Sequence, residues 1–124
     1  MKSTLGLFIC LLLFVPVTSQ GRTWLVKKDG SGDCTGVQAC VDSASIGDTV
    51  LVGPGTYDEC LDMKSGVLLT SEQGPGVTVL QRAGGCGQAV VTMYMCDENT
   101  VVNGFTIAHG YGLTCPHSLY HFLS

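Results

Sequence analysis

From Asp48 onward, apolar and β-branched residues gather in runs of three or four that are separated by short turns. Two of these turns, 53–55 and 74–76, place a proline between two glycines, a combination that interrupts regular structure. Runs of this length, rich in valine, leucine and threonine, predict short β-strands. The expected strands lie at residues 23–26, 49–52, 60–63, 67–70, 78–81, 89–92, 100–103 and 105–107.

The expected strands recur along the chain. The shift that superposes 67–70 on 89–92 also superposes 78–81 on 100–103, with turns of equal length between them. A period of about 20–50 residues that contains several short strands is typical of a solenoid. Each rung of such a fold pairs its backbone with the rungs above and below, so valine and leucine are expected to stack into an inner column. The superposed strands are about 22 residues apart, and at this period residues 48–109 supply about three rungs.

The alternative architecture is a β-sandwich. Its neighbouring strands are usually joined by tight Asn-Gly or Asp-Gly hairpin turns. Among the repeating strands, Asn103-Gly104 is the one such pair. The pattern therefore favours the solenoid.

A short helix is expected before the first rung. Between residues 35 and 44, apolar residues fall on one side of a helix, at Val37, Cys40, Val41 and Ala44. Thr35 is suited to accept the first backbone amides, and Gly47 is suited to end the helix. Because the first rung of a solenoid leaves backbone groups unpaired, this helix is predicted to lie across that end as a cap.

The N-terminal segment, 1–19, has the pattern of a secretory signal peptide. Lys2 provides a positive start, residues 5–17 are almost wholly apolar, and Val17 and Ser19 stand three positions and one position before the expected cut. The apolar run is shorter than the about 20 residues that comfortably span a bilayer, although an uncleaved membrane anchor is the alternative. We therefore expect a secreted or cell-surface protein with no membrane span after cleavage.

These patterns divide the chain into four parts. They are a signal peptide at 1–19, an N-terminal strand and capping helix at 20–47, β-helix rungs at 48–110, and an irregular tail at 111–124. The tail has no repeat and no strand series, so the chain is expected to be truncated. Without a cap, the last rung near 101–107 would expose unpaired backbone groups, and self-association through that edge is expected.

Charge and cysteine content narrow the choice of partners. The chain has ten acidic and six basic residues, a net charge of −4 and no basic cluster, which makes nucleic acid a poor partner. Six of the seven cysteines follow the expected cut, and an even count in an exported chain predicts at least two disulfides, in a connectivity that the sequence leaves open. The alternative for Cys115 is a zinc site with His117 and His121.

The order of several segments resembles the opening of right-handed parallel β-helix proteins of the pectin-lyase-like superfamily. The segments that carry this resemblance are Asp29–Asp33, Val37–Ala44 and Gly47–Tyr57. Further matches to secreted repeat proteins of that group are Met63–Val67, Thr70–Glu72 and Gly104–Ile107. The resemblance covers roughly residues 23–110, and it implies an all-β, right-handed parallel β-helix.

The resemblance does not imply a single activity, because this opening occurs in pectinesterases, in lyases and in members of no known activity. The catalytic aspartates, glutamines and arginine of pectinesterases lie on rungs beyond the matched stretch, so the catalytic residues of this chain are unknown. We expect a polysaccharide- or surface-binding repeat protein without catalysis in this chain. The alternative is the N-terminal part of a carbohydrate-active enzyme of the pectinesterase or polysaccharide lyase type.

One group of acids is a candidate metal site. Asp58, Glu59 and Asp62 surround a turn, and polysaccharide lyases of the resembled superfamily often bind calcium. Calcium takes six to eight oxygen ligands, but the spacing of these acids matches no calcium loop. We expect them to be solvated turn residues, and we predict no metal or cofactor site.

The remaining candidates are each expected to serve structure rather than chemistry. His109 has no nucleophile placed to use it, and the glycine-rich run 84–87 lacks the lysine of a phosphate loop. Aromatic side chains could stack on sugars but are expected to pack at strand ends: Tyr57, Tyr94 and Tyr111. The acids expected in turns are Asp29, Asp33, Asp97 and Glu98.

Overall fold

The computed structural model describes residues 21–85, 89–93, 97–109, 113–114 and 121–123. Its strands are short because turns containing glycine and proline interrupt the chain at close intervals. In chain order the elements are β1 (Thr23–Val26), α2 (Val37–Ser43), β2 (Thr49–Val52), β3 (Gly55–Asp58), β4 (Leu61–Asp62), β5 (Leu68–Ser71), β6 (Thr78–Gln81), β7 (Val91–Thr92), β8 (Val101–Asn103), β9 (Thr106–Ala108), β10 (Leu113–Thr114) and β11 (His121–Leu123).

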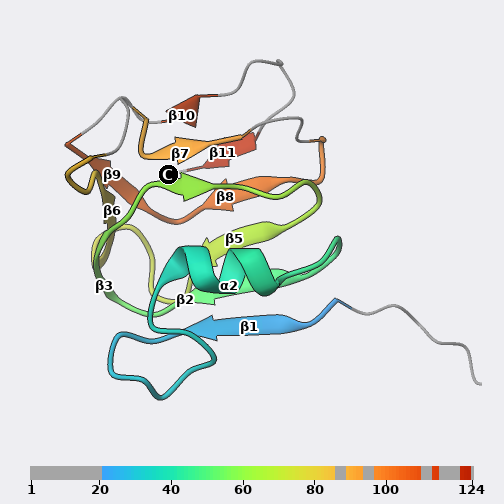
Figure 1. The fold of residues 1–124 in the computed structure, drawn as a ribbon, viewed down its shortest axis with the longest axis horizontal. Coiled ribbons are helices and arrows are strands. Elements are labelled where there is room, and N and C mark those ends of the chain that lie inside the picture. Colours follow the sequence, from blue (N-terminus) through green and yellow to red (C-terminus); the bar gives the residue numbers. More distant parts are fainter. Residues whose placement is uncertain (1–20, 86–88, 94–96, 110–112, 115–120, 124) are drawn as a thin grey trace, which may run out of the picture.

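The strands form three sheets in which all neighbours are parallel (Figure 1). Their orders are β1-β2-β5-β8-β11, β3-β6-β9 and β4-β7-β10. From β2 onward the chain visits the three sheets in turn, adding one strand to each before it returns to the first. We call this arrangement the stack. It is consistent with the predicted all-β solenoid, in which each rung contacts its neighbours along the chain.

The predicted superposition of strands is wrong, because the spacing between paired strands varies along the chain. Leu68 of β5 pairs with Thr49 before it and with Val101 after it, and the second interval along the chain is much longer than the first. The shift of 67–70 onto 89–92 superposed β5 on β7, yet β7 belongs to another sheet and pairs with β4 there. The connections between strands differ in length, so equal offsets along the chain do not mark equal positions in the rungs.

The predicted inner column is confirmed. In the first sheet, paired positions place Val50, Leu69 and Val102 in register, and all three are fully buried. Buried and partly exposed residues alternate along β2, as they must where one face of a strand meets the core. In the second sheet, Tyr57 pairs with Leu80 in the same way. The core therefore runs along the inside of the stack, between the three sheets.

The predicted helix exists, and its apolar side is buried at Val37, Cys40 and Val41. It packs against β1, β2 and β4, at the N-terminal end of the stack (Figure 1). Its boundaries differ from the prediction. The N-cap is Gly36 rather than Thr35, and the helix ends before Ala44 rather than at Gly47. Gly47 instead occupies a turn at a φ of 91°, where its amide donates to the carbonyl of Gly66.

The expectation of a tail without strands is wrong for the parts of residues 111–124 that the structure describes. β10 pairs with β7, and β11 pairs with β8 in the order His121 to Val101, Phe122 to Val102 and Leu123 to Asn103. Strands as short as these two carry too little hydrophobic periodicity to be recognised in a sequence. They continue the third and first sheets by one strand each.

Two further expectations concern the disulfides and the signal peptide. Cys34 and Cys40 form a disulfide, and Cys60 is disulfide-bonded as well, so the prediction of at least two disulfides is confirmed. The expected signal peptide, residues 1–19, lies outside the described residues. Within the part of the chain that the structure describes, no helix is long and apolar enough to cross a membrane.

Candidate functional site

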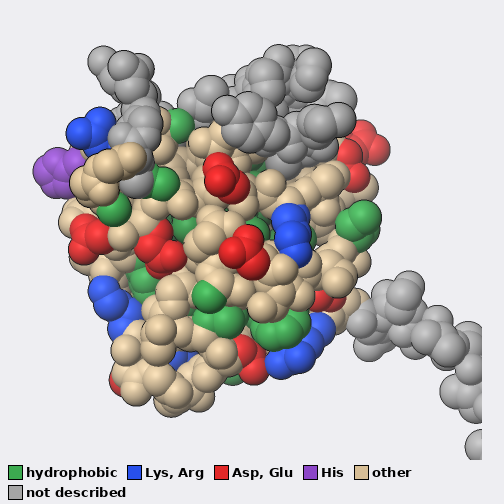
Figure 2. All heavy atoms as spheres, viewed as in Figure 1, with side chains coloured by type: hydrophobic (Ala, Val, Ile, Leu, Met, Phe, Trp, Pro, Cys, Tyr) green, Lys and Arg blue, Asp and Glu red, His purple; other side chains and the backbone are tan. Residues whose placement is uncertain are grey.

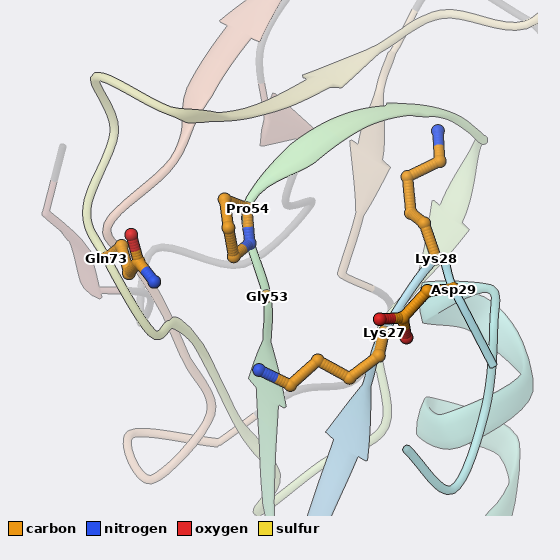
Figure 3. Close-up of a pocket in the computed structure, with 6 residues that line it drawn as sticks. All are labelled: Lys27, Lys28, Asp29, Gly53, Pro54 and Gln73. Carbon is orange, nitrogen blue, oxygen red and sulfur yellow. The ribbon is translucent and has the colours of Figure 1, made fainter. Parts of the chain in front are cut away.

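A hollow of about 310 Å³ opens beside the corner between β2 and β3. Three stretches that are far apart in the sequence line it: the residues just after β1, the corner itself, and the loop between β5 and β6 (Figure 3). The lining residues are Lys27, Lys28, Asp29, Gly53, Pro54 and Gln73. Neighbouring rungs supply the walls, so the hollow exists only because β1, β2 and β5 stack.

The corner Gly53-Pro54-Gly55 makes room for the two lysine side chains. A Cβ atom at Gly53 would lie 2.9 Å from Cδ of Lys27, and one at Gly55 would lie 2.8 Å from Cδ of Lys28. Real Cβ atoms essentially never come that close to another carbon, so larger residues here would displace the lysines. Figure 3 shows Lys27 extended beside Gly53. The two glycines therefore position both ammonium groups at the hollow.

Both ammonium groups have partners. Nζ of Lys27 forms an ion pair with Glu72, the residue before Gln73. Nζ of Lys28 donates to the backbone carbonyl of Thr56 and lies 5.0 Å from the centre of the Tyr57 ring. These contacts hold the lysines in place, and they also reduce the positive charge that a ligand would meet.

Tyr57 fixes the shape of the corner. Its ring is buried, and its hydroxyl donates to the carbonyl of Gly53 at 2.8 Å. Burial raises the pKa of Tyr57, and the negative charges of Glu59 and Asp29 add to that shift. The phenol therefore remains a hydrogen-bond donor at neutral pH. The expectation that Tyr57 packs is confirmed, while Tyr94 and Tyr111 lie outside the described residues.

Asp29 closes the hollow on the side of the β1 loop. Its carboxylate accepts hydrogen bonds from the hydroxyl of Ser31 at 2.6 Å and from the amide of Ser31 at 2.9 Å. The hydroxyl bond and then the amide bond lower the pKa of Asp29, so this carboxylate is ionised at neutral pH. Asp33 holds the same loop, since it accepts from the amide of Leu25. The prediction that both aspartates form turns is confirmed.

Two of the three acids considered as calcium ligands have separate partners. Both oxygens of Glu59 accept amides of α2, from Val37 at 2.7 Å and from Gln38 at 3.1 Å. The carboxylate of Asp58 accepts from the side-chain amide of Gln81. Among the described residues, no three His, Cys, Asp or Glu side chains are grouped so that they could hold a metal ion. Asp62 is exposed at the end of β4.

Acidic side chains are spread over the face that carries α2 rather than gathered at one point, as Figure 2 shows. Asp97 and Glu98 lie in the exposed turn that was predicted for them. His109 is exposed after β9, with a φ of 58°. The zinc candidates Cys115 and His117 and part of the glycine-rich run 84–87 lie outside the described residues, as does the side chain of His121.

The sequence analysis did not single out Lys27, Lys28 or Gln73 as site residues. The stretch Gly53–Tyr57 was interpreted only as a strand break, and this is wrong because β3 begins inside it at Gly55. Two glycines around a proline at a corner are also a signal of close approach by another segment. Nothing in the sequence indicates which segment approaches. Comparison of the chain with models of known protein families, with curated proteins and with solved structures found no match.

Proposed function

We propose that this protein is a secreted, right-handed parallel β-helix of the pectin-lyase-like kind, and that it binds extracellular polysaccharide without transforming it. Two features support the architecture and the compartment: three stacked parallel sheets and the Cys34–Cys40 disulfide. Disulfides of this kind persist mainly in oxidising compartments. The stacked outer faces suit an extended polymer better than a small soluble ligand.

The observation that carries the proposal is the hollow at the corner between β2 and β3. Its volume of about 310 Å³ lies at the lower end of the range for ligand sites, which is enough for about one sugar unit. Its walls offer ammonium and amide donors, a carboxylate acceptor and the apolar ring of Pro54. Sugars present hydroxyl groups around their edge and C–H groups on their faces, and this mixture of wall chemistry matches both.

The outer face of the first sheet can extend such a site. Parallel strands lie about 4.8 Å apart, so β1, β2 and β5 present a regular series of outward side chains beside the hollow. Leu51 and Thr70 face outward in register on β2 and β5 and are partly exposed. Further units of a polymer whose one unit occupies the hollow would lie along this face.

The experiment is affinity electrophoresis of the secreted protein in native gels that contain soluble polysaccharides. The proposal expects at least one polysaccharide to retard the protein. Gln73→Ala removes a lining amide from an exposed side chain, and it should weaken binding about fivefold, the value of one ordinary hydrogen bond. Glu98→Ala is the matched control, because Glu98 is exposed in a turn of another connection, and it should leave retardation unchanged.

The same samples test the enzyme alternative. If the chain were part of a pectinesterase or a lyase that is active on its own, incubation with pectin or polygalacturonate would release methanol or unsaturated products. We expect no release above a buffer control, with or without added calcium. Release that follows the purified protein through successive columns would overturn the proposal of binding without catalysis, and absence of retardation by every polysaccharide would overturn the proposal of binding.

A further inference from the structure

The hollow is electrically balanced. Lys27 and Lys28 place two ammonium groups at its walls, whereas Asp29 and Glu72 place two carboxylates in or beside it. Glu72 does not line the hollow but forms the ion pair with Lys27. Counted together, these four groups carry no net charge at neutral pH.

An acidic ligand would gain little from this arrangement. A ligand carboxylate that approaches Lys27 would meet Glu72, which is already paired with that ammonium group. Glu72 and the ionised Asp29 would both repel the ligand, and this repulsion offsets its attraction to Lys27 and Lys28. Since Lys27 and Glu72 are both partly exposed, their attraction to any ion is also weakened by water and salt.

A neutral sugar would meet no such conflict. Its hydroxyl groups can donate to Asp29 and accept from Lys27, Lys28 or the amide of Gln73, and none of these groups has to give up an ionic partner. One face of the ring can lie against Pro54, which is exposed at the corner. The resulting site would bind weakly by itself, because it is small and open, and it would gain strength from further units along the outer face of the first sheet.

We propose that the hollow accepts a neutral hexose or pentose unit of an extracellular polysaccharide in preference to a uronic acid unit. This inference rests on the proposed function. It adds the class of sugar that binds and the four charged groups, counted above, that decide between neutral and acidic units. The charge balance also predicts how the preference can be changed. Glu72→Gln removes the carboxylate from Lys27, so the hollow becomes positive by one charge and should admit an acidic unit.

The experiment measures binding by titration calorimetry at low ionic strength. The probes are neutral hexasaccharides of glucose, mannose and xylose, and a hexagalacturonate of the same length. We expect the wild-type protein to bind at least one neutral probe at least tenfold more tightly than the acidic probe. Glu72→Gln should strengthen binding of the hexagalacturonate about fivefold and change binding of the neutral probe less than twofold.

Two more variants test whether the change in hexagalacturonate binding arises at the hollow. Asp29→Asn also makes the hollow positive, and it can still accept the hydrogen bonds of Ser31, so it should act in the same direction as Glu72→Gln. Asp62→Asn is the matched control, because Asp62 is an exposed carboxylate on β4, away from the hollow, and it should change neither probe.

Each other result has a defined meaning. If the wild-type protein prefers the hexagalacturonate, the inference is wrong while the proposed function survives. If neutral probes bind but Gln73→Ala has no effect on them, the hollow is not the site and the inference is wrong. If no probe of either class binds and no polysaccharide retards the protein, the proposed function and the inference both fail.

Discussion

The N-terminal end of the stack and its inner rungs satisfy their backbone groups in different ways. Between rungs, strand pairs with strand, as β2 does with β5 and β5 with β8. At the N-terminal end of the described residues, where these sheets have their first strands, groups from outside the three sheets occupy the edge of β1, of β3 and of β4. Unpaired strand edges attract other chains, so this difference shows how the protein closes one end of an otherwise open architecture.

Each of the three edges has its own partner. At β1, the carbonyl of Leu25 accepts the amides of Asp33 and Cys34, and the amide of Lys27 donates to the carbonyl of Cys34. At β3, Nζ of Lys28 donates to the carbonyl of Thr56.

At β4, the side-chain amide of Gln38 replaces a strand. Its Oε1 accepts the amide of Asp62 at 2.8 Å, and its Nε2 donates to the carbonyl of Asp62 at 3.2 Å. Gln38 thus presents a donor and an acceptor as a peptide group would. The disulfide between Cys34 and Cys40 joins the segment that covers β1 to the helix that covers β4.

Glu59 and Lys64 hold the helix at its two ends. Glu59 accepts the first amides of α2, whereas Nζ of Lys64 donates to the carbonyl of Asp42 in the last turn and to that of Ala44, the C-cap. Both side chains come from the first rung, so α2 is fixed to the rung whose edge it covers. A helix this short would not be stable alone, and these contacts together with its buried side explain why it forms.

The largest expected loss of stability comes from a substitution in the core of the inner rungs. Leu69→Ala removes a fully buried side chain between Val50 and Val102, and the free energy of unfolding should fall by about 3 kcal/mol. Leu68→Ala is the matched control, since the neighbouring Leu68 faces outward and is partly exposed, and its cost should stay below about 1 kcal/mol. Urea unfolding followed by circular dichroism measures both. Equal losses for the two variants would contradict the assignment of the inner face.

The second largest loss of stability is expected from removing the Cys34–Cys40 disulfide, which joins the segment that covers β1 to α2. The double variant Cys34→Ser, Cys40→Ser should lower the free energy of unfolding by about 2 kcal/mol, because the crosslinked loop is short. It should also free the segment that covers β1, so light scattering should show more concentration-dependent association than the wild-type protein shows under the same conditions. A variant with an unchanged urea midpoint and a single monomeric size would show that the cap closes without this bond.

A smaller effect is expected from the side chain that covers β4. Gln38→Met keeps the length and the helix propensity of the residue but removes both hydrogen bonds to Asp62, which should cost about 1 kcal/mol. Ser43→Ala, which removes the hydroxyl bond to Ala39 within α2, is the control. Hydrogen exchange should be faster at the amide of Asp62 in the first variant alone. Unchanged exchange there would mean that Gln38 does not protect the edge.

The turn before β2 should make stability depend on pH. Asp48 accepts hydrogen bonds from the amide of Ser45, the indole of Trp24 and the amide of Arg22, and these bonds in that order lower its pKa. A carboxylate with a lowered pKa in the folded state stabilises the fold above about pH 4, and this contribution is lost as the pH falls through the lowered value.

Asp48→Asn tests this contribution. The variant should be less stable at pH 7, because an amide cannot accept with both of its polar atoms, and its stability should change less between pH 5 and pH 2. Thermal melts across that range give the comparison. A variant whose stability falls as steeply with acidification as that of the wild-type protein would assign the acid sensitivity to other carboxylates.

The smallest expected change in the free energy of unfolding is an increase, and it concerns Thr78. Thr78 is fully buried in β6, and its hydroxyl has no hydrogen-bond partner among the described residues. Thr78→Val replaces that hydroxyl with a methyl group of similar size, so the free energy of unfolding should rise by up to about 1 kcal/mol. A decrease measured in urea would indicate that the hydroxyl has a partner which this variant removes.

Self-association through the C-terminal edge stays a prediction. This edge was predicted near residues 101–107; β11 covers the part that β8 forms, whereas β9 remains the last described strand of its sheet. Among the described strands, the last ones of the three sheets are β9, β10 and β11. Sedimentation at several protein concentrations would test whether the protein associates.

The chain's apolar pattern was sufficient to predict short strands, one capping helix and an inner column, because each depends on local composition and on the alternation of side chains. Val50, Leu69 and Val102 are buried because they are apolar at inward positions of their strands, whatever lies between them. The register was not predictable in the same way. The pairing of Leu68 with Val101 depends on loop lengths that no local preference encodes.

The hollow illustrates the same limit. Lys27, Gly53 and Gln73 are separated by whole strands, and each by itself looks like an ordinary turn or surface residue. The sequence by itself determined most of the longer strands and which side of each is buried, since hydrophobic burial acts residue by residue. Only the tertiary structure decided which strands pair and which polar groups share a surface, because those contacts arise from the stacking of distant segments.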